Sequence, residues 1–247
     1  MLDWIVPDWP APTRVRACVT TRNGGYSQGP YAQLNLAEHV GDDPLQVQRN
    51  RLLVDQLLGC QATWLNQVHS CDVVAASNDL VTADASYSTT PYLAACVMTA
   101  DCLPVLFCDR QGSIVAAAHA GWRGLAQGIL EATVQQMQVP ASELMAWLGP
   151  AIGPEVFEVG PEVLEAFVSI QPEAKLAFVP AARAGHWYAD IYALARLRLQ
   201  RVGVTAVYGG EFCTMTDAQQ RFFSYRQQAV TGRFASLVWL TEEPIGG

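Results

Sequence analysis

Short apolar segments bounded by turn residues alternate along this chain with segments that have a helical period. Three of the apolar segments follow one another closely, at Leu93–Thr99, Pro104–Cys108 and Ile114–Ala118. Runs of this length between turn residues are typical of buried β-strands. Three further strands are predicted on the same grounds, at Leu144–Leu148, Val204–Tyr208 and Ala235–Leu240.

Two amphipathic segments in the first part of the chain predict helices. Asp43 and Pro44 supply an N-cap and a first helical position, and Gly59 is expected to end that helix. Its apolar residues are Leu45, Leu52, Leu53 and Leu57. A second helix is expected from about residue 125 to residue 137. The residues expected to face a core in that second helix are Leu125, Ile129, Leu130, Val134 and Met137.

Two more helices are predicted in the second half. Pro161 opens one of them. Its apolar face consists of Val163, Leu164, Phe167 and Val168. Asp190 is expected to cap the other, which runs through Val202 and is closed by Gly203.

The order of these elements limits the fold class. Strands and helices interleave without a regular βαβ spacing, and no G-x-G-x-x-G pattern follows a strand. A mixed-sheet α/β or α+β fold is therefore favoured over a doubly wound Rossmann fold. No Gly/Ser linker, charge block or repeat interrupts the chain, so residues 1–247 are expected to form a single domain.

Charge and hydropathy exclude several classes of protein. The 15 Lys and Arg against 23 Asp and Glu give a formal net charge of −8, which argues against a general binder of nucleic acid or anionic membranes. No apolar run reaches the ~18–20 residues that span a bilayer. The start of the chain lacks the pattern of a signal peptide, and the seven cysteines form no C-x-x-C pair. Free thiols in a cytoplasmic protein are expected.

Three residues could carry metal or thiol chemistry. His69 lies in a polar loop, Cys102 directly follows the strand Leu93–Thr99 and the residue Asp101, and His119 ends a strand. Taken singly, each is as well explained by a structural role. Together, two imidazoles and one thiolate would fill three of the four positions of a catalytic zinc and leave one open. The same groups could instead form a Cys–His nucleophile pair without metal.

Polar side chains near these residues are candidates for binding substrate. Arg123 follows a strand and a glycine turn and precedes a helix, a setting that suits an anion, although an ordinary turn with a surface arginine has the same pattern. Arg22 lies in a second turn, next to an Asn-Gly pair. Asp84 and Asp101 are the nearest carboxylates. Either could orient a histidine, bind a ribose hydroxyl or cap a turn.

An ordered set of sequence blocks, spread over nearly the whole chain, resembles the YfiH-like laccase-domain family. That family is often labelled polyphenol oxidase and is also described as zinc-containing purine nucleoside phosphorylase. The blocks are Thr21–Gly25, Leu34–Leu36, Asn66–His69, Ala83–Ala85, Thr99–Val105, Ala118–Gly124, Leu148–Gly153, Phe157–Gly160 and Phe223–Arg226.

The resemblance implies a mixed α/β fold with a sandwich-like centre of β-sheets flanked by helices. It also implies a catalytic zinc ion held by His69, Cys102 and His119. The implied activities are phosphorolysis of adenosine, inosine and methylthioadenosine, and deamination of adenosine. Purine nucleosides and phosphate would be the partners, and both a monomer and a homodimer remain open. The residues expected to contact substrate or phosphate are Arg22, Asn35, Asp84, Arg123 and Arg226.

The competing family labels can be tested on histidine content. A multicopper oxidase builds its trinuclear copper cluster from paired H-x-H motifs, whereas this chain has four histidines and no H-x-H. A laccase in the strict sense is therefore excluded. The alternatives that remain are a hydrolase editing peptidoglycan precursors, a single-metal polyphenol oxidase and a purine-binding protein without enzymatic activity.

Overall fold

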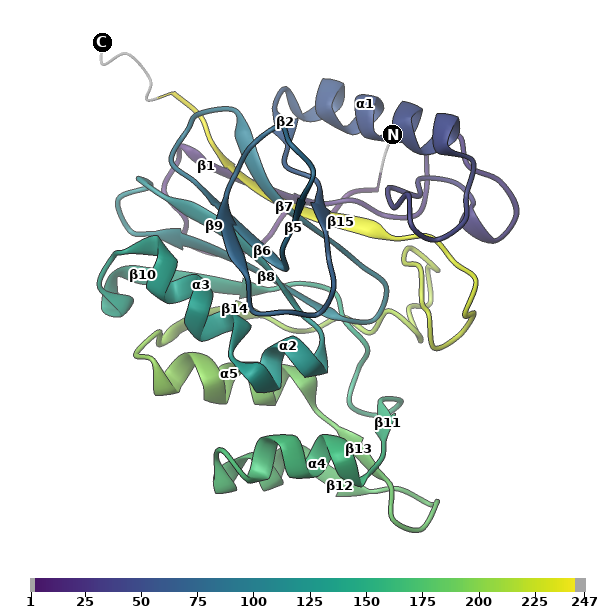
Figure 1. Ribbon diagram of the computed structural model, residues 1–247, viewed down its shortest axis with the longest axis vertical. Coiled ribbons are helices and arrows are strands. Elements are labelled where there is room, and N and C mark those ends of the chain that lie inside the picture. Colours follow the sequence, from purple (N-terminus) through teal and green to yellow (C-terminus); the bar gives the residue numbers. More distant parts are fainter. Residues whose placement is uncertain (1–2, 243–247) are drawn as a thin grey trace.

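Two β-sheets that pack face to face form the centre of the computed structural model, which describes residues 3–242 (Figure 1). In spatial order the larger sheet consists of β14 (Ala206–Gly209), β10 (Leu144–Leu148), β8 (Leu103–Asp109), β9 (Val115–Ala120), β6 (Ala85–Ser88) and β4 (Val73–Ala75). The smaller sheet consists of β1 (Val15–Val19), β15 (Phe234–Leu240), β7 (Leu93–Thr99) and β2 (Gln61–Ala62). Both sheets mix parallel with antiparallel pairs.

The central strands are apolar along their whole length because both of their faces are covered. In β8, Leu106 and Cys108 point into the space between the two sheets, where they pack with Val97 and Phe234 of the smaller sheet. Val105 points the opposite way, into a second core under the helices. This arrangement explains why the sequence shows continuous apolar runs rather than an alternating pattern.

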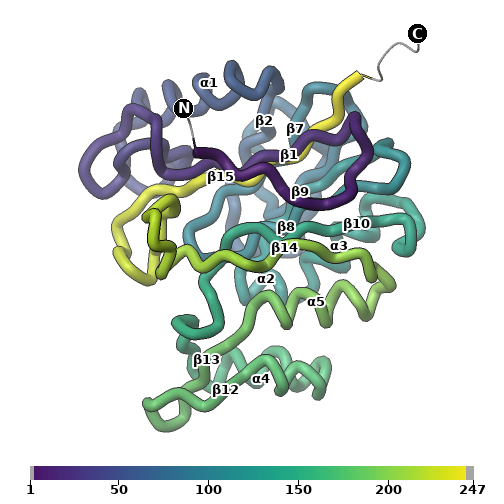
Figure 2. The backbone as a smooth tube through the Cα atoms, turned by 180° about the vertical axis from the view of Figure 1, so that it is seen from behind, coloured from purple at the N-terminus to yellow at the C-terminus, as the bar shows by residue number. Residues whose placement is uncertain are grey.

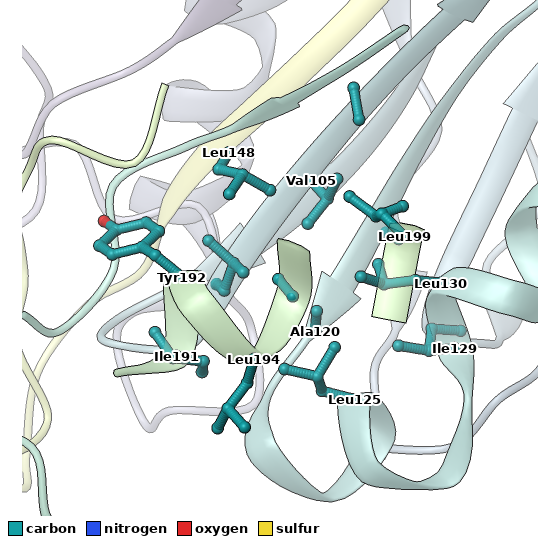
Figure 3. Close-up of a cluster of buried hydrophobic side chains, with 14 of the residues drawn as sticks. Val105, Ala120, Leu125, Ile129, Leu130, Leu148, Ile191, Tyr192, Leu194 and Leu199 are labelled. Carbon is teal, nitrogen blue, oxygen red and sulfur yellow. The ribbon is translucent and has the colours of Figure 1, made fainter. Parts of the chain in front are cut away.

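Helices cover the outer faces of both sheets. The helices α2 (Trp122–Gln127), α3 (Ile129–Met137) and α5 (Ile191–Arg201) pack on the six-stranded sheet, and Figure 3 shows their leucine and isoleucine side chains meeting those of the strands. The helix α1 (Pro44–Leu58) lies on the four-stranded sheet, on the opposite side of the molecule, as Figure 2 shows. The predicted sandwich-like centre flanked by helices is confirmed.

A smaller unit projects from the six-stranded sheet. It contains the three-stranded sheet β11-β13-β12 and the helix α4 (Figure 1). The bounds of these elements are Glu158–Val159 for β11, Pro161–Val168 for α4, Phe178–Pro180 for β12 and Trp187–Ala189 for β13. Elsewhere, β3 (Leu65–Asn66) pairs with β5 (Val81–Thr82), and short 3-10 helices occur at Gly29–Tyr31, Ala141–Glu143 and Pro172–Ala177. Among the described residues, no helix has both the length and the apolarity to cross a membrane.

The helix predictions need two corrections. In α1 the cap Asp43 and the stop Gly59 are present, but Leu45, Leu52 and Leu57 are exposed. The buried residues of α1 are instead Val47, Asn50 and Val54. The helix expected from residue 125 to residue 137 is divided between α2 and α3 by Gly128, whose φ of 107° belongs to the left-handed region. The five residues expected to face the core are all buried.

Candidate metal centre and substrate pocket

Three potential metal ligands from different parts of the chain converge beside the central sheets. His69 follows β3, Cys102 lies in the turn from β7 to β8, and His119 belongs to β9. Their ligating atoms all lie within 4.8 Å of one another. The sulfur of Cys102 is 3.7 Å from Nε2 of His69, and the two imidazole centroids are 4.7 Å apart. Within residues 3–242 this is the one group of three or more such side chains close enough to share a metal ion.

A buried carboxylate, that of Asp84, organises the two histidines. One of its oxygens accepts hydrogen bonds from Nδ1 of His119 at 2.8 Å and from the backbone N–H of His69 at 2.9 Å. The other accepts from the backbone N–H groups of Val68 and Ser70, at 3.1 and 2.6 Å. Because Nδ1 of His119 is engaged, Nε2 is the nitrogen left for a metal. Of the three roles that the sequence left open for Asp84, it orients a histidine and fixes a turn.

Ionisation of Asp84 is consistent with this role. Burial of the carboxyl would raise its pKa, but the hydrogen bond and charge of His119, together with the backbone donors, lower the pKa to about 2. Asp84 is therefore an anion at neutral pH, and it holds the polypeptide around His69 by charge-assisted hydrogen bonds.

The backbone near two of the ligands is held in an unusual conformation. His69 has a φ of 62° and Asp101, which precedes Cys102, has a φ of 83°. Residues other than glycine rarely adopt such values, and they persist where surrounding contacts fix them. Asp84 provides those contacts for His69. For Asp101, the carboxylate accepts hydrogen bonds of 2.6 Å from the Thr214 hydroxyl and from the backbone N–H of Arg226.

Gly121 allows the ligands to approach one another. A Cβ atom at this position would lie 2.9 Å from the sulfur of Cys102 and 2.8 Å from Cδ2 of His69. Both distances are well below van der Waals contact. The glycine two residues after His119 therefore leaves the room that the other two ligands occupy.

The thiol of Cys102 differs electrostatically from the buried cysteines of the core. Burial opposes its ionisation, but the neighbouring His119 and His69 lower its pKa below the usual range. Burial likewise acts to lower the pKa of His119, and the adjacent Cys102 and Asp84 raise it instead. By contrast, burial raises the pKa of Cys18, Cys60 and Cys108 to about 12. A thiolate is the form of cysteine that binds a metal, and Cys102 is the cysteine able to provide it here.

The donor set fits a metal ion. Two imidazoles and a thiolate suit zinc and would occupy three tetrahedral positions, leaving a fourth open for substrate. The tautomer of His119 is fixed, the thiol is acidified, and Gly121 keeps the centre of the group clear.

A cavity of about 340 Å³ opens beside the three ligands. Three arginines line it, and each lies against an aromatic ring. The guanidinium of Arg123 is 4.4 Å from the Trp122 ring, that of Arg226 is 5.7 Å from Phe157, and that of Arg233 is 5.9 Å from Tyr225. His39 and Gln67 also line this cavity, which we call the substrate pocket.

Two of the residues expected to contact substrate lie elsewhere. Nε of Arg22 donates to the carbonyl of Ala32 at 3.0 Å, and Arg22 lines a separate cavity. Asn35 is fully buried, and its Oδ1 accepts a 2.9 Å hydrogen bond from the backbone N–H of Arg233. Asn35 therefore supports a pocket arginine from behind. Asp84 acts through the histidines, whereas Arg123 and Arg226 line the pocket itself.

Sequence reasoning missed several pocket residues. Arg233, Tyr225 and His39 are not among the candidate site residues predicted from the sequence. One signal was available for Arg233, because it directly precedes the apolar strand β15 just as Cys102 directly precedes β8. Gln67 gave no such signal. Its side-chain amide pairs with both the N–H and the C=O of Met98 in β7, which pins the His69 segment to the smaller sheet.

Comparisons with known sequences identify the family of this chain. Residues 16–241 match the family described as multi-copper polyphenol oxidoreductase laccase. A Pseudomonas aeruginosa protein named purine nucleoside phosphorylase is 60% identical over 240 residues, covering 97% of this chain and 99% of that protein. Escherichia coli YfiH, also named purine nucleoside phosphorylase, is 51% identical over 241 residues, covering 96% and 98%.

Solved structures share the fold. A Neisseria meningitidis protein has a TM-score of 0.94 and 53% sequence identity, with 97% of this chain and 100% of that chain covered. YlmD from Geobacillus stearothermophilus has a TM-score of 0.88 and 29% identity, with 94% of each chain covered. The mixed α/β fold is thus shared over almost the entire length.

Proposed function

The chain belongs to the YfiH-like laccase-domain family, and from that membership we propose that it is a zinc-dependent purine nucleoside phosphorylase. Its substrates would be adenosine, inosine and methylthioadenosine, with deamination of adenosine as a second reaction. The observation that carries the proposal is the convergence of three arginines and three aromatic rings on the cavity next to the metal ligands. In a chain of net charge −8, such a gathering of arginines favours an anionic substrate.

The pocket has features suited to both proposed substrates, the purine nucleoside and phosphate. Its volume lies at the lower end of the ~300–1,000 Å³ that small-molecule sites typically have. The faces of Trp122, Phe157 and Tyr225 offer stacking surfaces for a purine. The side chain of Arg123 rests on Trp122 and has no hydrogen-bond partner among the described residues, so its donors are available to phosphate.

His69, Cys102 and His119 would hold the zinc ion, with Asp84 fixing the imidazole of His119 and the backbone of His69. Bound there, zinc would supply Lewis-acid polarisation of a substrate atom.

The chain's own residues would do the rest of the work. Arg123, Arg226 and Arg233 would neutralise phosphate and orient one of its oxygens toward C1′ of the nucleoside. In deamination, water instead of phosphate would be the nucleophile, and C6 of adenine would be the carbon attacked.

The test is product analysis with defined metal content. The purified protein is incubated with adenosine, inosine or methylthioadenosine, with and without phosphate, and ribose phosphate products, free base and inosine are quantified by chromatography. Phosphorolysis requires phosphate and yields a ribose 1-phosphate product, whereas deamination converts adenosine to inosine without phosphate. Cys102→Ala should lose both metal and turnover. Cys60→Ala, on the far side of the smaller sheet, is the matched control.

Absence of product with every nucleoside, at full zinc occupancy, would contradict the proposal. Release of an amino acid from a UDP-muramoyl conjugate would instead favour the peptidoglycan hydrolase, and oxygen uptake with a catechol would favour the single-metal polyphenol oxidase. Nucleoside binding without turnover would favour a binding protein. We also infer a cytoplasmic location, because all seven cysteines are free thiols.

A further inference from the structure

The substrate pocket contains one imidazole that takes no part in the candidate metal centre. His39 lies in the loop before α1 and lines the same cavity as His69, Cys102 and His119. Neither of its ring nitrogens has a hydrogen-bond partner among the described residues. His39 is therefore an ionisable side chain of the pocket whose ring nitrogens are available to a substrate.

Other ionisable groups of the pocket are less suited to moving a proton. Both carboxylate oxygens of Asp101 already accept hydrogen bonds, from Thr214 and from the backbone of Arg226. The arginines stay protonated at any physiological pH, and the ordinary pKa of a tyrosine is near 10. The imidazoles of His69 and His119 and the thiol of Cys102 are the candidate metal ligands. This elimination leaves His39.

Phosphorolysis of a purine nucleoside needs such a group. As an oxygen of phosphate bonds to C1′, the C1′–N9 bond breaks and its electron pair passes to the purine. The departing base is a strong base unless N7 is protonated, so a positioned acid lowers the barrier. We propose that His39 is a catalytic residue, the general acid that protonates the leaving purine. This inference rests on the proposed phosphorylase function.

The proton count closes over one turnover. His39 gives its proton to N7 of the base and becomes neutral. The hydrogen phosphate that attacked C1′ carries a proton of its own into the sugar phosphate. That proton is released to solvent, and His39, which is exposed, takes one up from solvent. No oxidant, reductant or further reactant is required.

The surroundings of His39 explain how phosphate would prepare it. Partial burial lowers its pKa, and the positive charges of Arg233 before β15 and Arg51 on α1 act in the same direction, as does His119 on β9. Glu38 opposes them. Phosphate bound at the arginines would bring negative charge into the pocket, and a nearby anion favours the protonated imidazole. His39 would thus take up its proton together with phosphate.

The decisive experiment compares two substrates in His39→Gln. Inosine requires a proton on its leaving base. 7-Methylinosine does not, because the methylated purine already carries the positive charge that protonation would supply. We expect kcat/KM for inosine to fall by about 10²-fold or more, while that for 7-methylinosine changes by only a few-fold. The wild-type decline of kcat/KM for inosine at high pH should be lost in the variant.

His186→Gln is the matched control, because His186 lies outside the substrate pocket. Zinc content and circular dichroism of both variants are compared with wild type. Equal losses for inosine and 7-methylinosine in a zinc-loaded, folded His39→Gln would overturn the assignment, as would wild-type activity on inosine. An inactive wild type would instead refute the proposed function, so the two failures are distinguishable.

Discussion

The carboxylate of Asp84, which directly precedes β6, lies 2.8 Å from the imidazole of His119 on the neighbouring strand β9, and both side chains are buried. The same oxygen also holds the backbone of His69, so two of the three candidate ligands depend on one buried anion. Asn in place of Asp would offer one acceptor oxygen where two are used, and its amide protons would face N–H donors. Each buried donor left unsatisfied costs about 1–3 kcal/mol.

Asp84→Asn is therefore expected to weaken zinc binding by roughly 10–100-fold and to lower the free energy of unfolding. Zinc retained during dialysis against graded chelator concentrations measures the first effect, and denaturant titration measures the second. The exposed Asp79, in the loop before β5, provides Asp79→Asn as the control. Wild-type zinc affinity in Asp84→Asn would show that the carboxylate does not position the ligands.

Gly121→Ala tests the room between the ligands. Gly121 has a φ of −58° and a ψ of 155°, which alanine adopts without strain, so the added methyl group alone is responsible for any effect. That methyl group would meet Cys102 and His69 at 2.9 and 2.8 Å. We expect a folded protein with at least about 10-fold weaker zinc binding, since supporting residues of metal sites carry effects of that size. Isothermal titration of the metal-stripped variant with zinc provides the measurement, and an unchanged affinity would contradict the steric argument.

Metal removal should expose a reactive thiol. Because the pKa of Cys102 is lowered below that of an ordinary thiol, its thiolate persists as the pH falls through neutrality, and its alkylation slows only below the ordinary range. In chelator-treated protein at pH 7, we expect iodoacetamide to label Cys102 first. Stoichiometric zinc should protect it. Cysteines such as Cys60, whose pKa burial raises to about 12, should stay unlabelled.

Peptide mass mapping over a time course reads out the order of labelling. Cys71 and Cys213 are also partly exposed, which makes them internal competitors. If either is modified before Cys102, the local charges do not activate this thiol. If zinc leaves the rate at Cys102 unchanged, the thiol is not a ligand.

The central strands could be predicted from the sequence because a strand that is buried on both faces must be apolar along its whole length. β7 and β10 begin and end at the predicted residues, since apolar runs there meet polar turns on both sides. The buried face of α1 was not predictable in this way. Asn50 faces inward because its amide donates to the Ser27 hydroxyl and to the backbone carbonyl of Asn35. Hydropathy favours leucines for the buried face of a helix. It cannot predict that Asn50 finds hydrogen-bond partners in residues distant in the sequence.

In the candidate site, too, some residues could be predicted from the sequence and others could not. His69, Cys102 and His119 belong to the few residue types that bind metals, so chemistry alone singled them out. Arginines, by contrast, are numerous in this chain, and residue type alone does not indicate which of them line the pocket. Arg22 and Arg226 are equivalent by sequence, yet Arg226 lines the substrate pocket and Arg22 lines a separate cavity. The packing of the loop before β15 brings Arg226 and Arg233 to the pocket. No local sequence pattern predicts that packing.

That loop supplies the last prediction. The hydroxyl of Thr214 donates to Asp101 at 2.6 Å, and the backbone of Arg226 donates to the other oxygen of the same carboxylate. Thr214→Val keeps the shape of the side chain but removes one of these two ties, at a cost of about 1–3 kcal/mol. The segment carrying Arg226 should then hold phosphate less firmly, and KM for phosphate should rise several-fold while zinc content stays at the wild-type level. Thr216→Val, at an exposed position two residues further on, is the control. A wild-type KM together with a fall in zinc would mean that Asp101 serves the Cys102 turn rather than the arginine.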